Sequence, residues 1–135
     1  MNFKIDTKEK FTTITAMQIE LYDNLTAELT ETANKVLKTD IKNVILNLQH
    51  VENIDEASAA NLANLQQTFY GNSASFVICK VQPSVEKQLE KFELFEMMNI
   101  TPSESEAWDI VQMEEIEREL MDDDNPLFNN HNGNT

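Results

Sequence analysis

The chain has few of the residues on which catalytic and cofactor sites commonly depend. Its 135 residues include two glycines, three prolines, one cysteine and two histidines. Two glycines exclude a P-loop and a dinucleotide-binding fingerprint, because each of these motifs needs several glycines close together. The histidines, His50 and His131, are far apart, and no expected helix carries a pair of metal ligands on one face. The sequence therefore predicts no enzyme, no cofactor and no metal site.

Disulfides and membrane segments are missing as well. The single cysteine, Cys79, excludes an internal disulfide, and its position in an apolar run predicts a small buried side chain rather than a nucleophile. No apolar run approaches the roughly 20 residues that a membrane-spanning helix needs. The first residues lack the apolar core of a signal peptide. We therefore expect a cytoplasmic protein without membrane insertion.

Positive charge is scarce: 10 Lys and Arg stand against 24 Asp and Glu, for a net charge of −14. Nucleic acids and anionic membranes are bound through clustered Lys and Arg, so neither is an expected partner. A basic or neutral protein surface remains compatible with this charge. Part of the acidity belongs to residues 122–135, which begin with three aspartates and continue into an asparagine-rich segment. This composition predicts a disordered tail.

Residues 1–121 show alternating strand and helix patterns. A hairpin is expected over residues 2–17, then a helix with Asp23 or Asn24 as N-cap, a strand at 44–48, and a helix from 55 to a break at Gly71. A strand at 75–79, a helix from Pro83, a short strand at 97–100 and a long helix from Ser103 to about Met121 complete the order. The fold class predicted is a single α/β domain, β-β-α-β-α-β-α-β-α, with a mixed central sheet of about five strands and about four helices.

The central segment joins a buried strand to a helix through an acidic junction. Val44–Leu48 is a short apolar run typical of a strand buried on both faces, and Ala59, Leu62, Leu65 and Phe69 share one helix face. Asp55 can cap the free N–H groups of that helix, and Glu56 adds about 0.3–1 kcal/mol of charge–dipole stabilisation. The junction is either an ordinary acidic N-cap or a recognition surface where negative charge is required.

The segment from Asn47 to the start of this helix resembles the signature of the STAS domain. That signature reads roughly Asp-Leu-Ser-x-Val-x-x-Ile-Asp-Ser-Ser-Gly, and Leu48, Val51, Ile54 and Asp55 match it. The chain departs from it in having Asn47, Glu56, Ala57 and Ser58 at the places of the first aspartate, the two serines and the glycine. The family includes bacterial anti-sigma-factor antagonists and the cytoplasmic domains of sulfate transporters.

The resemblance implies a protein-binding regulatory module that acts by partner switching. In the family, a partner kinase phosphorylates the first serine and thereby breaks the contact with the anti-sigma partner. Here Glu56 is the phosphoacceptor equivalent and carries a permanent negative charge, while Ser58 is a candidate substitute phosphoacceptor. The expected partner, an anti-sigma kinase-like protein, would bind a rim formed by the junction residues Asn53, Asp55, Glu56, Ala57 and Ser58.

The long last helix offers an alternative function. Its apolar positions predict one stripe along the helix, Ala107, Ile110, Met113, Ile116 and Leu120. The stripe either packs on the domain edge or forms a docking arm, through which the chain could make a homodimer. The alternative is therefore a scaffold subunit of a signalling or transport complex that uses this helix and the sheet edge. A small-ligand carrier is a third, weaker interpretation, because no phosphate-binding loop supports it.

Overall fold

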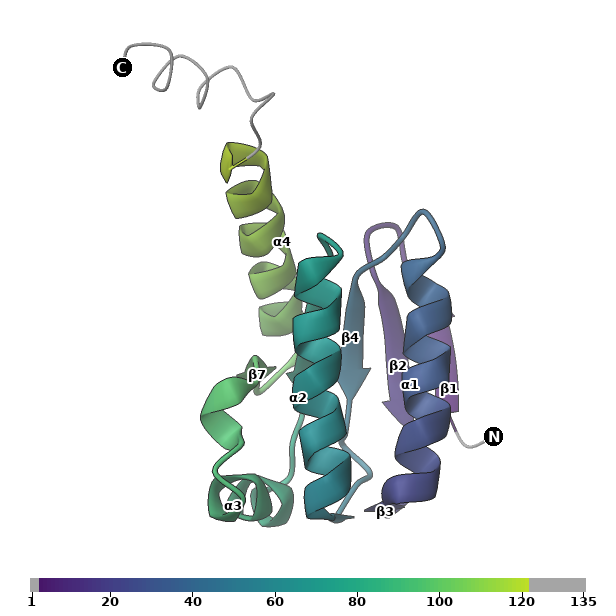
Figure 1. The fold of residues 1–135 in the computed structure, drawn as a ribbon, viewed down its shortest axis with the longest axis vertical. Helices are drawn as coiled ribbons and strands as arrows, with labels where there is room; N and C mark the ends of the chain where they lie inside the picture. Colours follow the sequence, from purple (N-terminus) through teal and green to yellow (C-terminus); the bar gives the residue numbers. More distant parts are fainter. Residues whose placement is uncertain (1–2, 122–135) are drawn as a thin grey trace.

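The computed structural model describes residues 3–121, apart from the side chains of Asp23 and Leu25, and its centre is a mixed five-stranded sheet (Figure 1). The strand order is β1-β2-β4-β6-β7, and only the β1–β2 pair is antiparallel. The strands are β1 (Phe3–Thr7), β2 (Thr12–Ala16), β4 (Val44–Asn47), β6 (Phe76–Cys79) and β7 (Ile100–Thr101). A second, two-stranded parallel sheet joins β3 (Glu20–Leu21) to β5 (Asn53–Ile54).

Four helices pack on the five-stranded sheet. They are α1 (Asp23–Leu37), α2 (Glu56–Gly71), α3 (Pro83–Lys91) and α4 (Glu104–Met121), and a short 3₁₀ helix, η1 (Phe95–Met97), precedes β7. Helices α1 and α2 lie side by side on one face of the sheet (Figure 1). This arrangement confirms the predicted α/β class, with five strands in the main sheet and four helices. Among residues 3–121, no helix is long and apolar enough to cross a membrane.

The two faces of the sheet are buried in separate apolar clusters. Along β4 and the residue that follows it, Val44, Leu46 and Leu48 belong to the cluster that also contains the inner faces of α1, α2 and α3. Ile45, which lies between Val44 and Leu46, belongs to a smaller cluster on the opposite face, where α4 covers the sheet. Successive strand residues point to opposite faces of the sheet, and all four residues of β4 are buried. The predicted strand buried on both faces is therefore confirmed.

Several element boundaries differ from the predictions. The N-cap of α1 is Tyr22 and makes no side-chain capping bond, so neither Asp23 nor Asn24 is the cap. Gly71 is the last residue of α2 rather than the residue after it, and the left-handed conformation falls on Ser73, at a φ of 58°. The last strand is Ile100–Thr101 rather than 97–100, because Met97 ends η1 and the next two residues are irregular.

Helix α4 begins and ends as predicted, but its apolar residues do not form one stripe. Ser103 Oγ accepts a hydrogen bond from the Glu106 backbone N–H at 3.1 Å, as the capping pattern predicts. Ala107 is buried, whereas Met113, Ile116 and Leu120 are largely exposed. The single-stripe prediction was therefore wrong. Most residues of the predicted stripe are three positions apart, and three residues turn an α-helix by about 300° rather than a full circle. Each such step therefore moves the next side chain about 60° around the helix axis, away from the side on which Ala107 is buried.

Candidate functional site

The acidic junction lies at the end of the molecule where β5 leads into α2 (Figure 1). Asp55 is the N-cap of α2, and its Oδ1 accepts a hydrogen bond from the Ser58 backbone N–H at 2.8 Å. Glu56 is the first residue of the helix, and both Glu56 and Ala57 are exposed. A fixed carboxylate at the surface therefore lies beside the partial positive charge of the helix start.

Ser58 is placed differently from the other junction residues. Its side chain is fully buried, and the Ser58 and Thr26 hydroxyl oxygens form a 2.6 Å hydrogen bond that joins α2 to α1. A phosphoacceptor must present its hydroxyl to the kinase, and this hydroxyl lies between two helices instead. The structure therefore argues against Ser58 as a substitute phosphoacceptor, and the helix start packs through the Ser58 side chain.

The loop before α2 is held in place by α3. The Gln88 side chain accepts a hydrogen bond from the Ile54 backbone N–H at 2.9 Å and donates one to Asn53 Oδ1 at 3.3 Å. Ser84 Oγ donates to the Glu52 carbonyl at 2.8 Å. These bonds fix the backbone on which Asp55 and Glu56 sit. The junction is therefore preorganised before any partner binds, which reduces the entropy cost of binding.

Several residues that the sequence analysis did not assign to any site lie next to the junction in the structure. Pairing of β3 with β5 places Met17, Ile19, Glu20 and Tyr22 at the same end of the molecule. Ile19 is 58% exposed and Met17 48% exposed, although both are apolar. Nothing in the sequence indicated that two short strands, β3 and β5, would pair here.

Tyr22 forms a hydrogen bond with an acidic residue of this surface. Its hydroxyl donates a hydrogen bond to Glu20 Oε2 at 3.1 Å. That bond to Glu20 raises the pKa of Tyr22 above its usual value, with smaller contributions from burial and from the negative charges of Glu20 and Asp55. The phenol is therefore a neutral hydrogen-bonding group, with its ring exposed at the surface.

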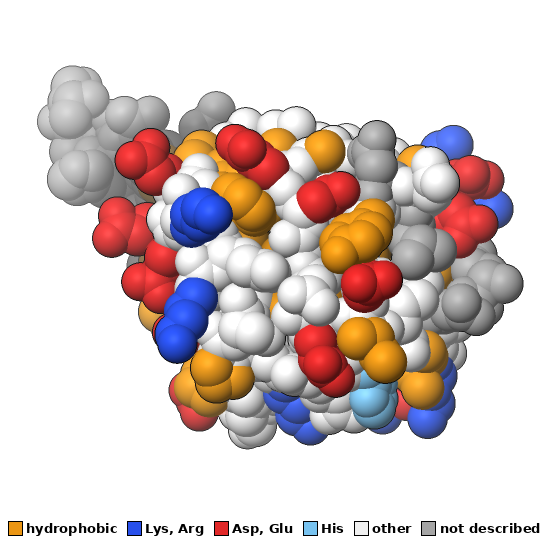
Figure 2. Space-filling view, turned by 90° about the horizontal axis from the view of Figure 1, so that it is seen from below, with side chains coloured by type: hydrophobic (Ala, Val, Ile, Leu, Met, Phe, Trp, Pro, Cys, Tyr) orange, Lys and Arg blue, Asp and Glu red, His pale blue; other side chains and the backbone are white. Residues whose placement is uncertain are grey.

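Together these residues form a continuous mixed surface, which we call the rim face. Figure 2 looks onto this end of the molecule and shows acidic and hydrophobic side chains interspersed across it, with most Lys and Arg nearer the margins. The rim face consists of Met17, Ile19, Glu20, Tyr22, Glu52, Asn53, Asp55, Glu56 and Ala57. Exposed apolar side chains rimmed by polar ones are typical of a protein–protein contact.

The described residues contain no group of three or more His, Cys, Asp or Glu side chains that could hold a metal ion. Cys79 is fully buried in β6, as the sequence predicts. Burial raises the pKa of its thiol to about 11, from an ordinary value of 9.0; the nearby Glu104 carboxylate adds to the rise and Lys80 opposes it. A thiol of this kind is protonated at neutral pH and is a poor nucleophile.

Ionisation of Cys79 is expected to reduce stability at high pH. The thiol ionises near pH 9.0 in the unfolded chain and near 11 in the folded one, so the free energy of unfolding falls as the pH rises through this window. Urea unfolding of the wild type and Cys79→Ala across this range measures the effect, and the variant should lose less stability than the wild type. Equal losses would assign the pH dependence to other groups.

The family assignment follows from a match over most of the chain. The STAS domain family model matches residues 2–107. The chain belongs to the STAS domain family. The match ends within the first turn of α4, so most of that helix lies beyond the family domain.

Solved structures of STAS domains share this fold at low sequence identity. An anti-sigma-factor antagonist domain protein from Planctomyces limnophilus is 16% identical, with a TM-score of 0.68 over 82% of this chain and 97% of its own. A serine-to-glutamate variant of RsbS from Moorella thermoacetica is 16% identical, with a TM-score of 0.67 over 83% and 96%. The murine anion transporter Slc26a9 is 18% identical, with a TM-score of 0.61 over 77% of this chain and 18% of the transporter. These likenesses establish the fold.

Proposed function

We propose that the protein is a non-enzymatic regulatory module that binds a protein partner through the rim face, in the manner of an anti-sigma-factor antagonist. The observation that carries the proposal is the exposed Glu56 at the start of α2, on a surface where acidic and apolar side chains alternate. The preorganised loop and the exposed Met17 and Ile19 support it. A cytoplasmic location is part of the same proposal.

Glu56 acts in this proposal as a permanent form of the signal that related domains make reversibly. A phosphoserine carries about −1.5 to −2 charge, whereas a glutamate carries one negative charge that no phosphatase removes. Solved relatives include SpoIIAA in unphosphorylated and phosphorylated forms and the serine-to-glutamate variant of RsbS. The partner of this chain therefore accepts an anionic rim, and kinase control at this position is absent.

The partner's surface follows from the chemistry of the rim face. Three of its carboxylates, on Glu20, Glu52 and Glu56, are exposed, and within residues 3–121 none of them forms an ion pair with a basic side chain. A surface that combines Lys or Arg with apolar side chains would complement both components. An anti-sigma kinase-like protein with such a surface is the partner proposed.

Reversing the charge of Glu56 is expected to weaken partner binding at least tenfold, or about 1.4 kcal/mol. The tagged full chain, Glu56→Arg and the matched control Glu28→Arg would be used to capture partners from the native host, with the captured proteins identified by mass spectrometry. Glu28→Arg makes the same change in net charge as Glu56→Arg. Glu28 is exposed on α1, outside the rim face, so its replacement should not affect the contact.

The decisive comparison is between the two variants. A partner held by the wild type and Glu28→Arg but lost by Glu56→Arg supports the rim face. A partner lost equally from both variants would indicate a general charge effect. A partner retained by Glu56→Arg would remove Glu56 from the mechanism. Circular dichroism of each variant tests whether its helix content, and with it the fold, is retained.

A scaffold function is the second candidate, and the exposed apolar residues of α4 favour it. Met113, Ile116 and Leu120 have no role in the domain core. Deleting residues 113–135 would be a poor test, because it also removes Glu115 and Arg118, which bond the helix to the domain. Substituting only the exposed side chains of Met113, Ile116 and Leu120 would separate the scaffold function from binding through the rim face.

A further inference from the structure

The second half of α4 has its polar and apolar sides reversed relative to an ordinary surface helix. A helix on a globular domain normally buries an apolar stripe and exposes charge. Here the residues that face the domain are Glu114, Glu115 and Arg118, which are partly buried, while Met113 and Ile116 face away from it. This reversal is a feature of the described helix and needs an explanation that core packing does not provide.

Specific hydrogen bonds hold the polar side against the domain. Glu115 Oε2 accepts from Asn43 Nδ2 at 3.1 Å, and Glu114 Oε2 accepts from Asn99 Nδ2 at 3.0 Å. Arg118 donates to Ser75 Oγ at 3.2 Å. Because these contacts come from three separate segments of the domain, the helix is fixed in its rotation about its own axis. Its outer face is therefore presented in one defined orientation.

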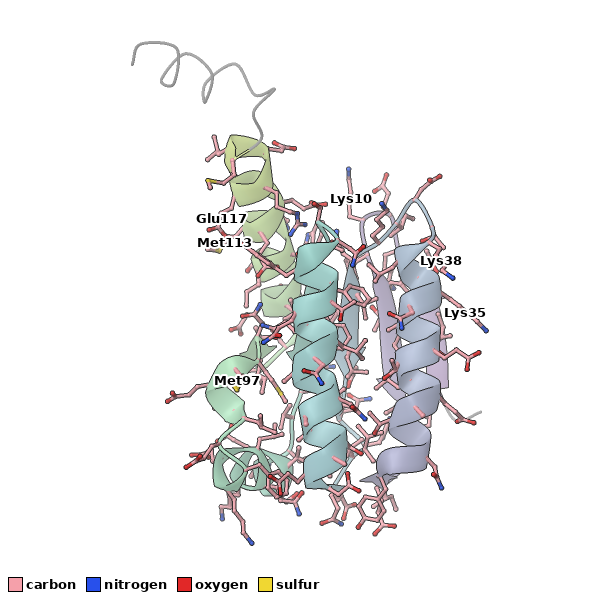
Figure 3. All side chains as sticks on the ribbon, in the orientation of Figure 1. Lys10, Lys35, Lys38, Met97, Met113 and Glu117 are labelled. Carbon is pink, nitrogen blue, oxygen red and sulfur yellow. The ribbon has the colours of Figure 1, made fainter. Side chains whose placement is uncertain are left out.

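The outer face carries an apolar stripe. Met113, Ile116 and Leu120 follow one another at spacings of three and four residues, which places them on one side of the helix. Their exposed fractions are 61%, 56% and 45%. Figure 3 shows Met113 and Glu117 on the side of α4 that points away from α2. The second half of α4 reaches beyond the end of α2 in Figure 1.

The charge along this face has one sign. Asp109 and Glu117 lie four residues before and after Met113, on the same side of the helix, and both are exposed. The helix has one basic residue, Arg118, and its side chain is turned towards Ser75 on the inner side. The exposed apolar stripe is therefore accompanied by carboxylates alone.

A second copy of the chain fits this face poorly. Pairing two α4 helices would bring carboxylates of the same sign together in either orientation, in a chain of net charge −14. Three partly exposed side chains also supply only a fraction of the roughly 800 Å² per partner that stable interfaces bury. A membrane surface with anionic lipids would be repelled for the same electrostatic reason.

We propose that the outer face of α4, formed by Met113, Ile116 and Leu120 with Asp109 and Glu117, docks an amphipathic helix of a partner protein whose apolar stripe is flanked by Lys or Arg. The apolar stripes pack together and the basic flanks pair with the carboxylates, which sets the orientation. The small area makes the contact weak and reversible. This surface is separate from the rim face, so the proposal does not depend on the partner proposed there; it rests on the scaffold function, the second candidate, and names the kind of partner that α4 would hold.

Synthetic helical peptides test this proposal with the full-length protein. Three peptides match α4 in length at 18 residues. One has leucines on one face and lysines elsewhere, the second has glutamates in place of the lysines, and the third has the lysine composition in scrambled order. Fluorescence anisotropy should show the amphipathic lysine peptide binding at least tenfold more tightly than either of the others. Its binding should weaken as salt is added.

Variants locate the contact. Met113→Gln/Ile116→Gln/Leu120→Gln removes the outer stripe without touching the inner bonds, and it should weaken the lysine peptide at least tenfold. The matched control, Ile5→Gln/Met97→Gln, removes two other exposed apolar side chains and should bind as the wild type does. Methyl NMR of the methionines should show Met113 shifting on binding while Met97 does not.

Several outcomes would overturn the proposal. Equal binding of the scrambled peptide would show simple attraction to an acidic protein. Unchanged binding by the triple variant would place the contact elsewhere. A concentration-dependent dimer in sedimentation experiments, abolished by the triple variant, would assign the face to a second copy of the chain.

Discussion

A glutamate in place of Ser58 is expected to destabilise the domain by about 3–5 kcal/mol. The Ser58 side chain is fully buried and its hydroxyl bonds to Thr26, so Ser58→Glu places an unpaired charge between α1 and α2. Ser58→Ala removes only the hydrogen bond and should cost about 1–2 kcal/mol. Urea unfolding followed by circular dichroism measures both changes.

The neighbouring position supplies a matched control for the added charge. Ala57 is exposed in the same helical turn, and a glutamate there interacts favourably with the helix start. Ala57→Glu should therefore leave stability nearly unchanged. If Ser58→Glu were as stable as Ala57→Glu, the side chain of residue 58 would be able to turn outward, and Ser58 would return as a candidate phosphoacceptor.

This comparison bears directly on regulation at the rim face. A phosphate on Ser58 carries more charge than glutamate, so it would require the α1–α2 contact to open. Glu56 imposes no such cost, because its carboxylate is already at the surface. A rim with a constant charge is therefore compatible with an intact domain, whereas modification of Ser58 is expected to disturb the contact between α1 and α2.

Replacing Asn43 by leucine is expected to cost about 3 kcal/mol, because it leaves several buried groups without partners. The Asn43 side chain is buried and accepts a hydrogen bond from the Ser75 backbone N–H at 2.9 Å. It also donates to the Lys10 carbonyl and to Glu115, each at 3.1 Å. One side chain thus connects the β1–β2 turn, the start of β6 and α4.

The effect should be local as well as global. Hydrogen exchange in Asn43→Leu should speed up in the second half of α4, because Glu115 loses its contact with the domain, while α1 should change less. The control Asn64→Leu makes the same replacement at an exposed position of α2 and should change stability by less than about 0.5 kcal/mol. Equal stability of the two variants would show that Asn43 does not have this connecting role.

The sequence predicted the parts of the fold that depend on local periodicity. Val44–Leu48 could be recognised as a buried strand, and the positions of Ala59 and Phe69 showed which side of α2 is inside. The Asp55 cap depended only on residues within one helical turn. Each of these features is encoded by neighbours in the chain, so a short window of sequence contains the information.

Features that depend on distant pairing were not predictable in this way. The β3–β5 pair joins residues more than 30 positions apart, and it is this pair that adds Ile19 and Tyr22 to the rim face. Ser58 looked like any hydroxyl near a helix start, because its partner Thr26 lies on another helix. The roles of Glu56 and of the rim residues remain predictions, and residues 122–135, predicted to be a disordered tail, lie outside the described part of the chain.

The unequal cover of the sheet has a consequence for synthesis of the protein. One face is covered by three helices, whereas the other is covered by α4, whose Ala107 and Val111 complete the cluster of Ile45, Val77 and Cys79. Phe11, Trp108 and Ile110 pack against this cluster. Helix α4 follows every strand of the sheet in the sequence, so strands that pair before α4 is synthesised are expected to leave most of this apolar face uncovered. Until α4 arrives, this face is the surface at which the growing chain is open to chaperones and to aggregation.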